Sequence, residues 1–336
     1  MGDSPRCVGS ALCADGESRI MQDPALYADC RSAETLVLPP CVTVSMPDFP
    51  LSKLTHQFGE HVIDKASGQE VFHVNSSHVL IQAAGYLKHN LALIEGMGVY
   101  FRGQTRLYDE ITPSLFRGIG NNSNKIPQRR DKIDELIDSI YSAGDALRSV
   151  DRRCAEPLLQ HYGVRTTWLD VVDNIWVAIW FACNDAISYR RGEYLHFEPR
   201  IPDFYRSGEP EYAYVLLIAS ANQPADGLPG HFASERSETV DLRIAAPSHF
   251  VRPHAQHGLL VRRLSKTSRA VSDMSPLHVG TIRIDLPAAL EWLGSASTLT
   301  THSLFPPAYY DYGYRELLDH VSPIRLELGA IHRIQP

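Results

Sequence analysis

Apolar and polar residues alternate along the chain with two periods, which predict strands and helices in mixed order. Runs rich in β-branched and aromatic residues indicate strands at 99–103, 212–219 and 277–286. Apolar positions recur at helical spacing across 78–87, and 129–155 carries the apolar stripe of an amphipathic helix or helix pair. The pattern therefore predicts an α+β fold.

One helix is predicted to be buried. Residues 175–182 are apolar on nearly every face, so no side of this helix is suited to water and its aromatic residues are expected in the core. Residues 164–169, which predict a strand, lead to Asp170, and an unpaired carboxylate between two buried elements is costly. Asp170 is predicted either to hold the helix N-terminus, as a cap or in a salt bridge, or to act directly in catalysis.

The chain divides into three predicted segments. Residues 1–40 mix Gly, Ser, Asp, Ala and Cys without a sustained period, which predicts a poorly ordered leader. Residues 41–74 hold short apolar pieces broken by proline and glycine, which predict a small entry segment with strands. The main domain is expected at 75–336.

The composition narrows the class of protein. A formal charge of -7 and a pI near 6.1 argue against binding nucleic acid by bulk charge, although they leave a local basic cleft open. No run approaches the roughly 18 apolar residues of a spanning helix, and residues 1–20 carry charges in place of an apolar signal core. We therefore expect a cytoplasmic protein without a membrane contact.

The spacing of cysteine and histidine predicts no metal site. The six cysteines lie at positions 7, 13, 30, 41, 154 and 183. They form no Cys-x-x-Cys pair, so free thiols are expected. His249, His254 and His257 lie close together, but Pro253 would interrupt a helix that aligned them.

Two stretches place polar side chains beside predicted buried strands. In the first, Val99-Tyr100-Phe101 runs into Arg102, Gly103 and Gln104, which puts a guanidinium at a strand end. Its planar fork of donors suits a bidentate grip on phosphate or carboxylate, and the alternative is a structural ion pair with a neighbouring acid. The second stretch runs from Leu158 to Asp170.

The two stretches, together with three others, resemble the FRG domain, a bacterial-type family named after its Phe/Tyr-Arg-Gly motif. The resembling segments are 100–104, 112–117, 160–182, 255–259 and 303–306. The resemblance covers roughly residues 75–315. The chain departs from the family pattern where Val171-Val172 replaces the usual Trp-Thr and where Arg165 replaces a common proline, which implies altered ligand geometry or a degenerate site.

The order of elements is also similar to ADP-ribosyltransferases of the Arg-Ser-Glu kind, which implies a mixed, split β-sheet core with flanking helices. In those enzymes an Arg grips NAD, a Ser or Thr supports the nicotinamide ribose, and a Glu stabilises the oxocarbenium-like centre. The resemblance implies NAD as co-substrate and the catalytic residues Arg102, Thr167, Asp170 and Gln256.

The same resemblance implies a set of nucleotide-binding residues. They are Arg102, Gly103, Gln104, His161, Tyr162 and Thr166. The segment 255–259 supplies Gln256 where an acidic residue is expected, so the negative charge would have to come from Asp170 or Glu238.

Three functions are predicted. The first is an NAD-using ADP-ribosyltransferase or NAD glycohydrolase of toxin or defence type, whose macromolecular acceptor the sequence does not identify. The second is a non-catalytic nucleotide- or nucleic-acid-binding module in which Tyr162 and Trp168 stack on bases. Its anion contacts would be Arg102, Arg117, Arg165 and Arg252. The third is a nuclease or hydrolase that uses His161, Asp170 and His257 for acid–base chemistry.

Overall fold

A computed structural model describes residues 59–335, apart from 93–95, 120–123, 144–146, 191–192, 203–209, 226, 266–270, 295–297 and 322–325. The leader predicted at 1–40 and the first part of the entry segment lie outside the described residues. The rest of the entry segment forms strands β1 (Glu60–Ile63) and β2 (Glu70–Val74), which pair antiparallel.

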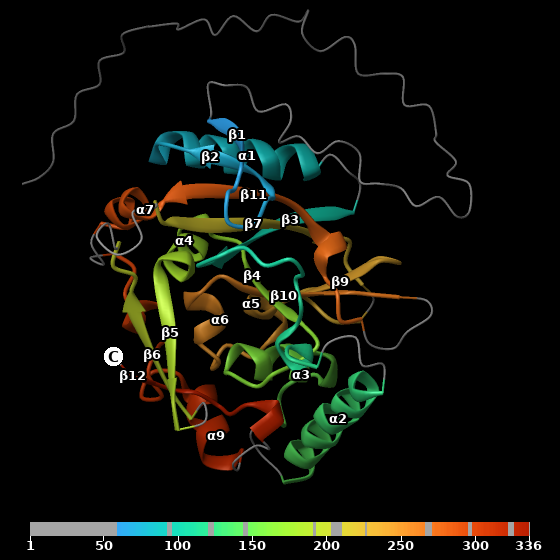
Figure 1. Cartoon of the computed structure of the whole chain (residues 1–336). Helices are drawn as coiled ribbons and strands as arrows, with labels where there is room; N and C mark the ends of the chain where they lie inside the picture. The colour runs from blue at the N-terminus through green and yellow to red at the C-terminus, as the bar shows by residue number, and fades with distance from the viewer. Residues whose placement is uncertain are drawn as a thin grey trace, which may run out of the picture. The chain divides into compact units, whose positions relative to one another are not determined.

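Nine strands form one large sheet in the order β1-β2-β11-β7-β3-β4-β10-β9-β8 (Figure 1). Its further members are β3 (Met97–Gln104), β4 (Leu169–Val172), β7 (Tyr212–Ala221), β8 (His231–Ala233), β9 (Ser237–Asp241), β10 (Gly258–Arg263) and β11 (His278–Asp285). A smaller sheet has the order β12-β6-β5, from β5 (Asn184–Tyr189), β6 (Tyr194–Pro199) and β12 (Arg333–Gln335). Each sheet contains a parallel pair among antiparallel ones, so the predicted α+β class with a mixed sheet is confirmed.

The large sheet is nearly divided between β3 and β4. β3 pairs with β7 along its whole length, and β4 pairs with β10 over four residues. β3 and β4 are joined through the single pair Phe101–Val172. Beyond this pair the strands separate, and the side chain of Arg102 lies in the gap.

The two faces of the large sheet are covered differently, as the alternation of side chains in a strand requires. Val99 and Phe101 of β3 belong to the core shared with helices α1 (Ser77–Ala92), α4 (Ile175–Cys183) and α7 (Leu286–Trp292). Tyr100, between them, belongs to a second cluster formed by strands β4, β7 and β10. Figure 1 shows α1 above the sheet and α4 beside β3.

A third core lies under the remaining long helices. It gathers side chains of α2 (Lys125–Ala143), α3 (Arg152–His161) and α9 (Tyr312–His320), which Figure 1 shows below the large sheet. Short helices α5 (Leu242–Ala245), α6 (Arg252–Ala255) and α8 (Thr301–Leu304) join the strands of the second half of the chain. The stripe at 129–155 is therefore a helix pair, and the second helix, α3, ends at His161.

The predicted buried helix is confirmed as α4. Trp180 is buried in the first core, and Trp176 and Phe181 pack against it. Asn174 caps the helix by accepting a hydrogen bond from the backbone nitrogen of Trp176 (2.9 Å). Asp170 is therefore not the cap of this helix.

The strand predicted at 164–169 is shorter than expected, because β4 begins only at Leu169. The backbone before it bonds to loops and side chains instead of a neighbouring strand. The nitrogen of Arg165 donates to Leu328 O (2.8 Å), and that of Thr167 donates to Glu156 Oε1 (2.9 Å). No helix among the described residues combines the length and the apolar content needed to cross a bilayer.

Candidate functional site

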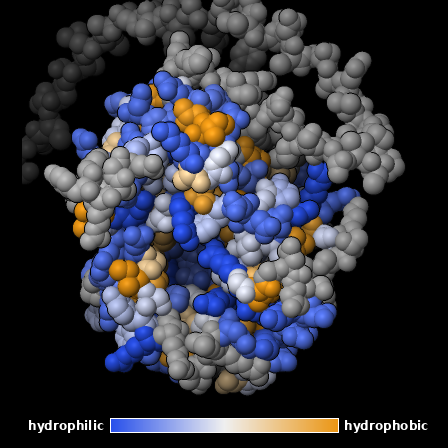
Figure 2. Space-filling view, in the orientation of Figure 1, coloured by the Kyte–Doolittle hydropathy of each residue, from blue (hydrophilic) through white to orange (hydrophobic). Residues whose placement is uncertain are grey.

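A cavity of about 1580 Å³ opens where β3 and β4 separate. Its walls come from β3, the loop at 105–118, the end of α3, β4, β5 and the start of α6. Figure 2 shows a hollow in the middle of the visible face with hydrophilic residues around it. The cavity therefore lies at the one place where the large sheet is held together by a single residue pair.

Arg102 spans the gap between the separating strands. Its Nη1 donates to the backbone oxygen of Asp170 (2.6 Å), while its Nε is buried without a partner among the described residues. Burial lowers the pKa of Arg102 to about 10, and the positive charge of Arg117 adds to this shift. The guanidinium is still protonated at neutral pH, so the cavity wall carries a poorly solvated cation with an unused donor.

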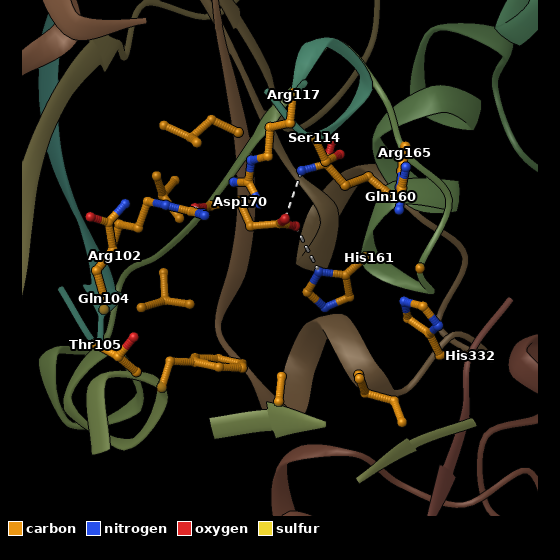
Figure 3. A pocket seen from close by; sticks show the side chains of 18 of the residues that line it. Arg102, Gln104, Thr105, Ser114, Arg117, Gln160, His161, Arg165, Asp170 and His332 are labelled. Atoms are coloured by element: carbon orange, nitrogen blue, oxygen red, sulfur yellow. Dashed lines mark hydrogen bonds and ion pairs between the residues drawn. The ribbon is translucent and has the colours of Figure 1, made fainter. Parts of the chain in front are cut away.

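Asp170 presents its carboxylate to the same cavity. Oδ2 accepts a hydrogen bond from Gln160 Nε2 (2.6 Å), and Oδ1 lies 3.8 Å from His161 Nδ1 (Figure 3). Burial favours the neutral acid, but the hydrogen bonds and charges of His161, Arg102 and Gln160 outweigh it and lower the pKa of Asp170. Its side chain is 45% exposed, so an ionised carboxylate is accessible to a ligand.

Gln160 links the carboxylate to the segment before β4. Its side-chain oxygen accepts a hydrogen bond from the Thr166 hydroxyl, which in turn accepts one from the backbone nitrogen of Trp168 (3.2 Å). Gln160 is therefore held at both ends and fixes the direction in which Asp170 points.

The cavity is locally basic although the chain is acidic. Its lining contains the arginines Arg102, Arg106, Arg117, Arg165 and Arg252. The carboxylates in the lining are Glu110, Asp170 and Asp185. A local excess of positive charge in a concave site favours an anionic ligand.

Residues 97–191 match the model of the FRG domain family. The chain contains an FRG domain. The matched segment runs from the start of β3 to just beyond β5, so it includes Arg102, Gln160, His161 and Asp170. No curated protein and no solved structure matches the chain. The resemblance to ADP-ribosyltransferases gains no support from these comparisons.

The fold brings most of the predicted site residues together, within and beyond the matched segment. Those that line the cavity are Arg102, Gly103, Gln104, His161, Asp170 and Gln256. Gln256 is distant from the motif in sequence, and its Nε2 donates to the backbone oxygen of Leu304 (2.8 Å). The other three predicted residues, Tyr162, Thr166 and Thr167, do not line it.

Tyr162 and Thr167 serve the cores beside the cavity. Tyr162 is fully buried, and its hydroxyl donates to Asp311 Oδ2 (2.7 Å). The hydroxyl of Thr167 donates to Glu156 Oε1 (2.7 Å) and accepts from Arg130 Nη1 (3.0 Å). Both groups are already paired within the protein, which corrects the expectation that they contact a ligand.

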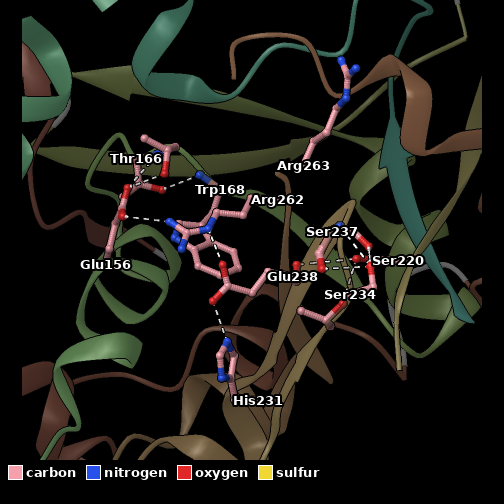
Figure 4. Close-up of polar contacts among 12 residues, drawn as sticks. Glu156, Thr166, Trp168, Ser220, His231, Ser234, Ser237, Glu238, Arg262 and Arg263 are labelled. Carbon is pink, nitrogen blue, oxygen red and sulfur yellow. Dashed lines mark hydrogen bonds and ion pairs between the residues drawn. The ribbon is translucent and has the colours of Figure 1, made fainter. Parts of the chain in front are cut away.

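Glu238, the other candidate anion, belongs to a separate polar cluster (Figure 4). Its carboxylate lies 2.5 Å from His231 Nε2 and 2.5 Å from Arg262 Nε, and it is not part of the cavity lining. Asp170 is therefore the carboxylate that accompanies Arg102.

The glycine of the family motif has a packing role. A Cβ at Gly103 would lie 1.8 Å from the backbone oxygen of Ala178 and 2.9 Å from the backbone nitrogen of Ala182. Only glycine lets β3 approach α4 this closely, so Gly103 positions the strand that carries Arg102.

The cavity lining also contains residues that the sequence pattern did not indicate. Arg106, Asp185 and His332 line the cavity. Arg106 follows β3 closely in the chain, whereas only the tertiary fold brings Asp185 and His332 to the same cavity. No group of three His, Cys, Asp or Glu side chains suited to a metal occurs among the residues that the structure describes.

Proposed function

We propose that the FRG domain binds an NAD-type dinucleotide in this cavity and that Asp170 stabilises positive charge while the bond to nicotinamide breaks. The observation that carries the proposal is the pairing of a cationic fork, Arg102, with an accessible carboxylate of lowered pKa, Asp170, in one cavity. The volume exceeds the roughly 300–1,000 Å³ of ordinary small-molecule sites, which leaves room for an extended ligand.

The chemistry assigned to each group follows from its charge. As the glycosidic bond breaks, its electron pair moves to the pyridinium nitrogen and nicotinamide leaves neutral, so positive charge builds on the ribose. A carboxylate beside that carbon stabilises the charge, and water or an acceptor then forms the new bond and releases a proton. Arg102 would hold a phosphate through its unpaired Nε.

The geometry argues against a hydrolase that uses histidine as its base. His161 Nδ1 faces Asp170, and its Nε2 is buried without a partner among the described residues. A Cβ at Gly258 would lie 3.0 Å from that Nε2, so the protein backbone occupies this side of the ring. His257 is not part of the lining, so the predicted trio does not share the cavity.

The predicted nucleic-acid-binding module requires aromatic rings that are exposed to stack on bases. Tyr162 and Trp168 are 0% and 1% exposed, so neither ring can stack on a base. A nucleotide-binding module without catalysis is the outcome that the following experiment distinguishes.

The test is release of free nicotinamide from millimolar NAD by the purified protein, with binding measured by calorimetry. Asp170→Asn should lower the release rate by roughly 100-fold or more while NAD still binds, because it removes the charge and keeps the shape. Asp185→Asn is the matched control, since it neutralises another carboxylate of the same cavity. Binding without release would indicate a non-catalytic module, and absence of both would overturn the proposal.

A further inference from the structure

Arg252 is a buried cation without a carboxylate partner. Its side chain lines the cavity, and the residue is 1% exposed. The carboxylate of Asp311 does not pair with this guanidinium. It accepts a hydrogen bond from the backbone nitrogen of Arg252 (3.0 Å) and another from the hydroxyl of Tyr162. Within the described part of the chain, no carboxylate forms an ion pair with the guanidinium.

Aromatic rings cover the guanidinium. Its central carbon lies 4.3 Å from the ring centre of Tyr162, 4.5 Å from that of Tyr314 and 5.3 Å from that of Phe305. Nη1 donates to the backbone oxygen of His161 (3.2 Å). The stacking contacts offset part of the cost of burying the charge, but they supply no hydrogen-bond acceptor in the plane of the group.

The two remaining nitrogens, Nε and Nη2, have no hydrogen-bond partner among the described residues. Their N–H groups point the same way along one edge of the guanidinium, which is the edge that binds two oxygens of one oxyanion. A buried cation with a complete unused fork is costly in an empty protein, and an anionic ligand removes that cost.

Two other arginines of the chain also stack on aromatic rings, and each of them has a carboxylate partner. Arg262 lies over Trp168 (4.4 Å), and its Nε donates to Glu238 Oε2 (2.5 Å). Arg283 lies over Tyr212 (4.1 Å), and its Nη1 is 3.5 Å from Asp64 Oδ1. Both carry a carboxylate where Arg252 has none.

We propose that the Arg252 end of the cavity is a phosphoryl-binding subsite, in which Nε and Nη2 of Arg252 bind two oxygens of one phosphate. This subsite rests on the proposed function, because it would hold a phosphate of the same dinucleotide. Gln256, His161 and Phe305 line the cavity with it. A phosphate bound there would lie beside the stacked rings of Tyr162, Tyr314 and Phe305. Arg252 itself lies outside the matched FRG segment.

The subsite is tested with inorganic pyrophosphate and ADP-ribose, each titrated into the full-length protein at constant ionic strength. Arg252→Met should weaken both by roughly tenfold to a hundredfold, the loss expected for two charge-assisted hydrogen bonds. Arg262→Met is the matched control, since it removes a stacked arginine that already has a carboxylate, and it should leave both affinities unchanged. In the unliganded protein, Arg252→Met should be no less stable than wild type, because it removes an unpaired buried charge.

A direct readout does not depend on any variant. The ¹⁵Nε–H signal of Arg252 should shift when pyrophosphate or ADP-ribose is added to wild type. A shift with pyrophosphate would show that phosphate groups bind the subsite without a nucleoside. A shift with ADP-ribose but not with pyrophosphate would show that binding at the subsite also requires the rest of the nucleotide. No shift with either ligand, or unchanged affinities in Arg252→Met, would overturn the subsite. Nicotinamide release is scored separately, so pyrophosphate binding without release would reject the proposed reaction and keep the subsite.

Discussion

At the scale of single residues, Asp170 owes its lowered pKa to its neighbours. Its partial burial favours the neutral acid, yet hydrogen bonds and nearby positive charge lower the pKa of its carboxyl. Its folded pKa is lower than its unfolded pKa. Ionisation therefore stabilises the fold above the unfolded pKa of about 3.9, and that stabilisation is lost as the pH falls through the folded value.

Gln160 is predicted to tune Asp170. Gln160→Met removes the hydrogen bond from Nε2 to the carboxylate, so the pKa of Asp170 should rise. The acidic limb of the pH profile for nicotinamide release should then move to higher pH. The same variant leaves the Thr166 hydroxyl without its acceptor, which should cost about 1 kcal/mol of unfolding free energy.

Thr167→Val is the matched control for this effect. It removes a buried hydroxyl that bonds to Glu156 and Arg130 outside the cavity, so it should cost about 1–2 kcal/mol of unfolding free energy. The acidic limb should stay in place. A similar displacement in both variants would mean that loss of stability, and not the pKa of Asp170, moves the profile.

At the scale of elements, β3 combines two tasks on its two faces. Arg102 reaches across the gap to β4, while Gly103 lets the strand lie against the backbone of α4. The motif therefore couples a cavity-lining side chain to a helix contact that sets its position. Loss of that contact should displace the strand that carries the guanidinium.

Gly103→Ala should destabilise the fold strongly. The added Cβ would fall 1.8 Å from the backbone oxygen of Ala178, and neither backbone can yield without moving an element. We expect the free energy of unfolding to fall by about 3 kcal/mol or more, measured by urea denaturation. In contrast, a Cβ at Gly85, an exposed position of α1, meets nothing within 4 Å, so Gly85→Ala should stabilise the protein by about 0.5–1 kcal/mol. Equal effects at the two glycines would contradict the close approach of β3 and α4.

At the scale of the whole molecule, charge and burial are distributed unevenly. The chain carries a formal charge of -7, yet five arginines and only three carboxylates line its large cavity. The cores around this cavity hold the two described cysteines, Cys154 and Cys183, both fully buried. Neither cysteine lines the cavity.

The two buried thiols should be unreactive in the folded protein. Burial raises the pKa of Cys154 and that of Cys183 to about 12. Native protein at pH 8 should therefore resist iodoacetamide at both positions, and both should react in urea, as peptide mass mapping can show. In the folded protein the pKa of each thiol lies above the unfolded value of about 8.5, so folding favours the neutral thiol. The free energy of unfolding should therefore decrease as the pH rises from about 8.5 to about 12. Rapid labelling of either cysteine in native protein would show that its core opens.

The sequence alone was sufficient for the features that depend on local pattern. Strand β3 follows from its run of β-branched and aromatic residues, and the buried helix α4 follows from the absence of a polar side. Strands and helices in mixed order along the chain indicate the α+β class. The sequence also singled out Arg102 and Asp170, because a guanidinium and a carboxylate beside buried elements are unusual, and both residues line the cavity.

Tertiary structure alone decided which polar groups are available to a ligand. Thr166 and Thr167 are neighbours of Asp170 in sequence, but hydrogen bonds within the protein use their hydroxyls. Arg252 and Arg262 have the same side chain stacked on aromatic rings, and only Arg262 meets a carboxylate. Such pairing depends on contacts between residues far apart in the chain, which local pattern does not encode.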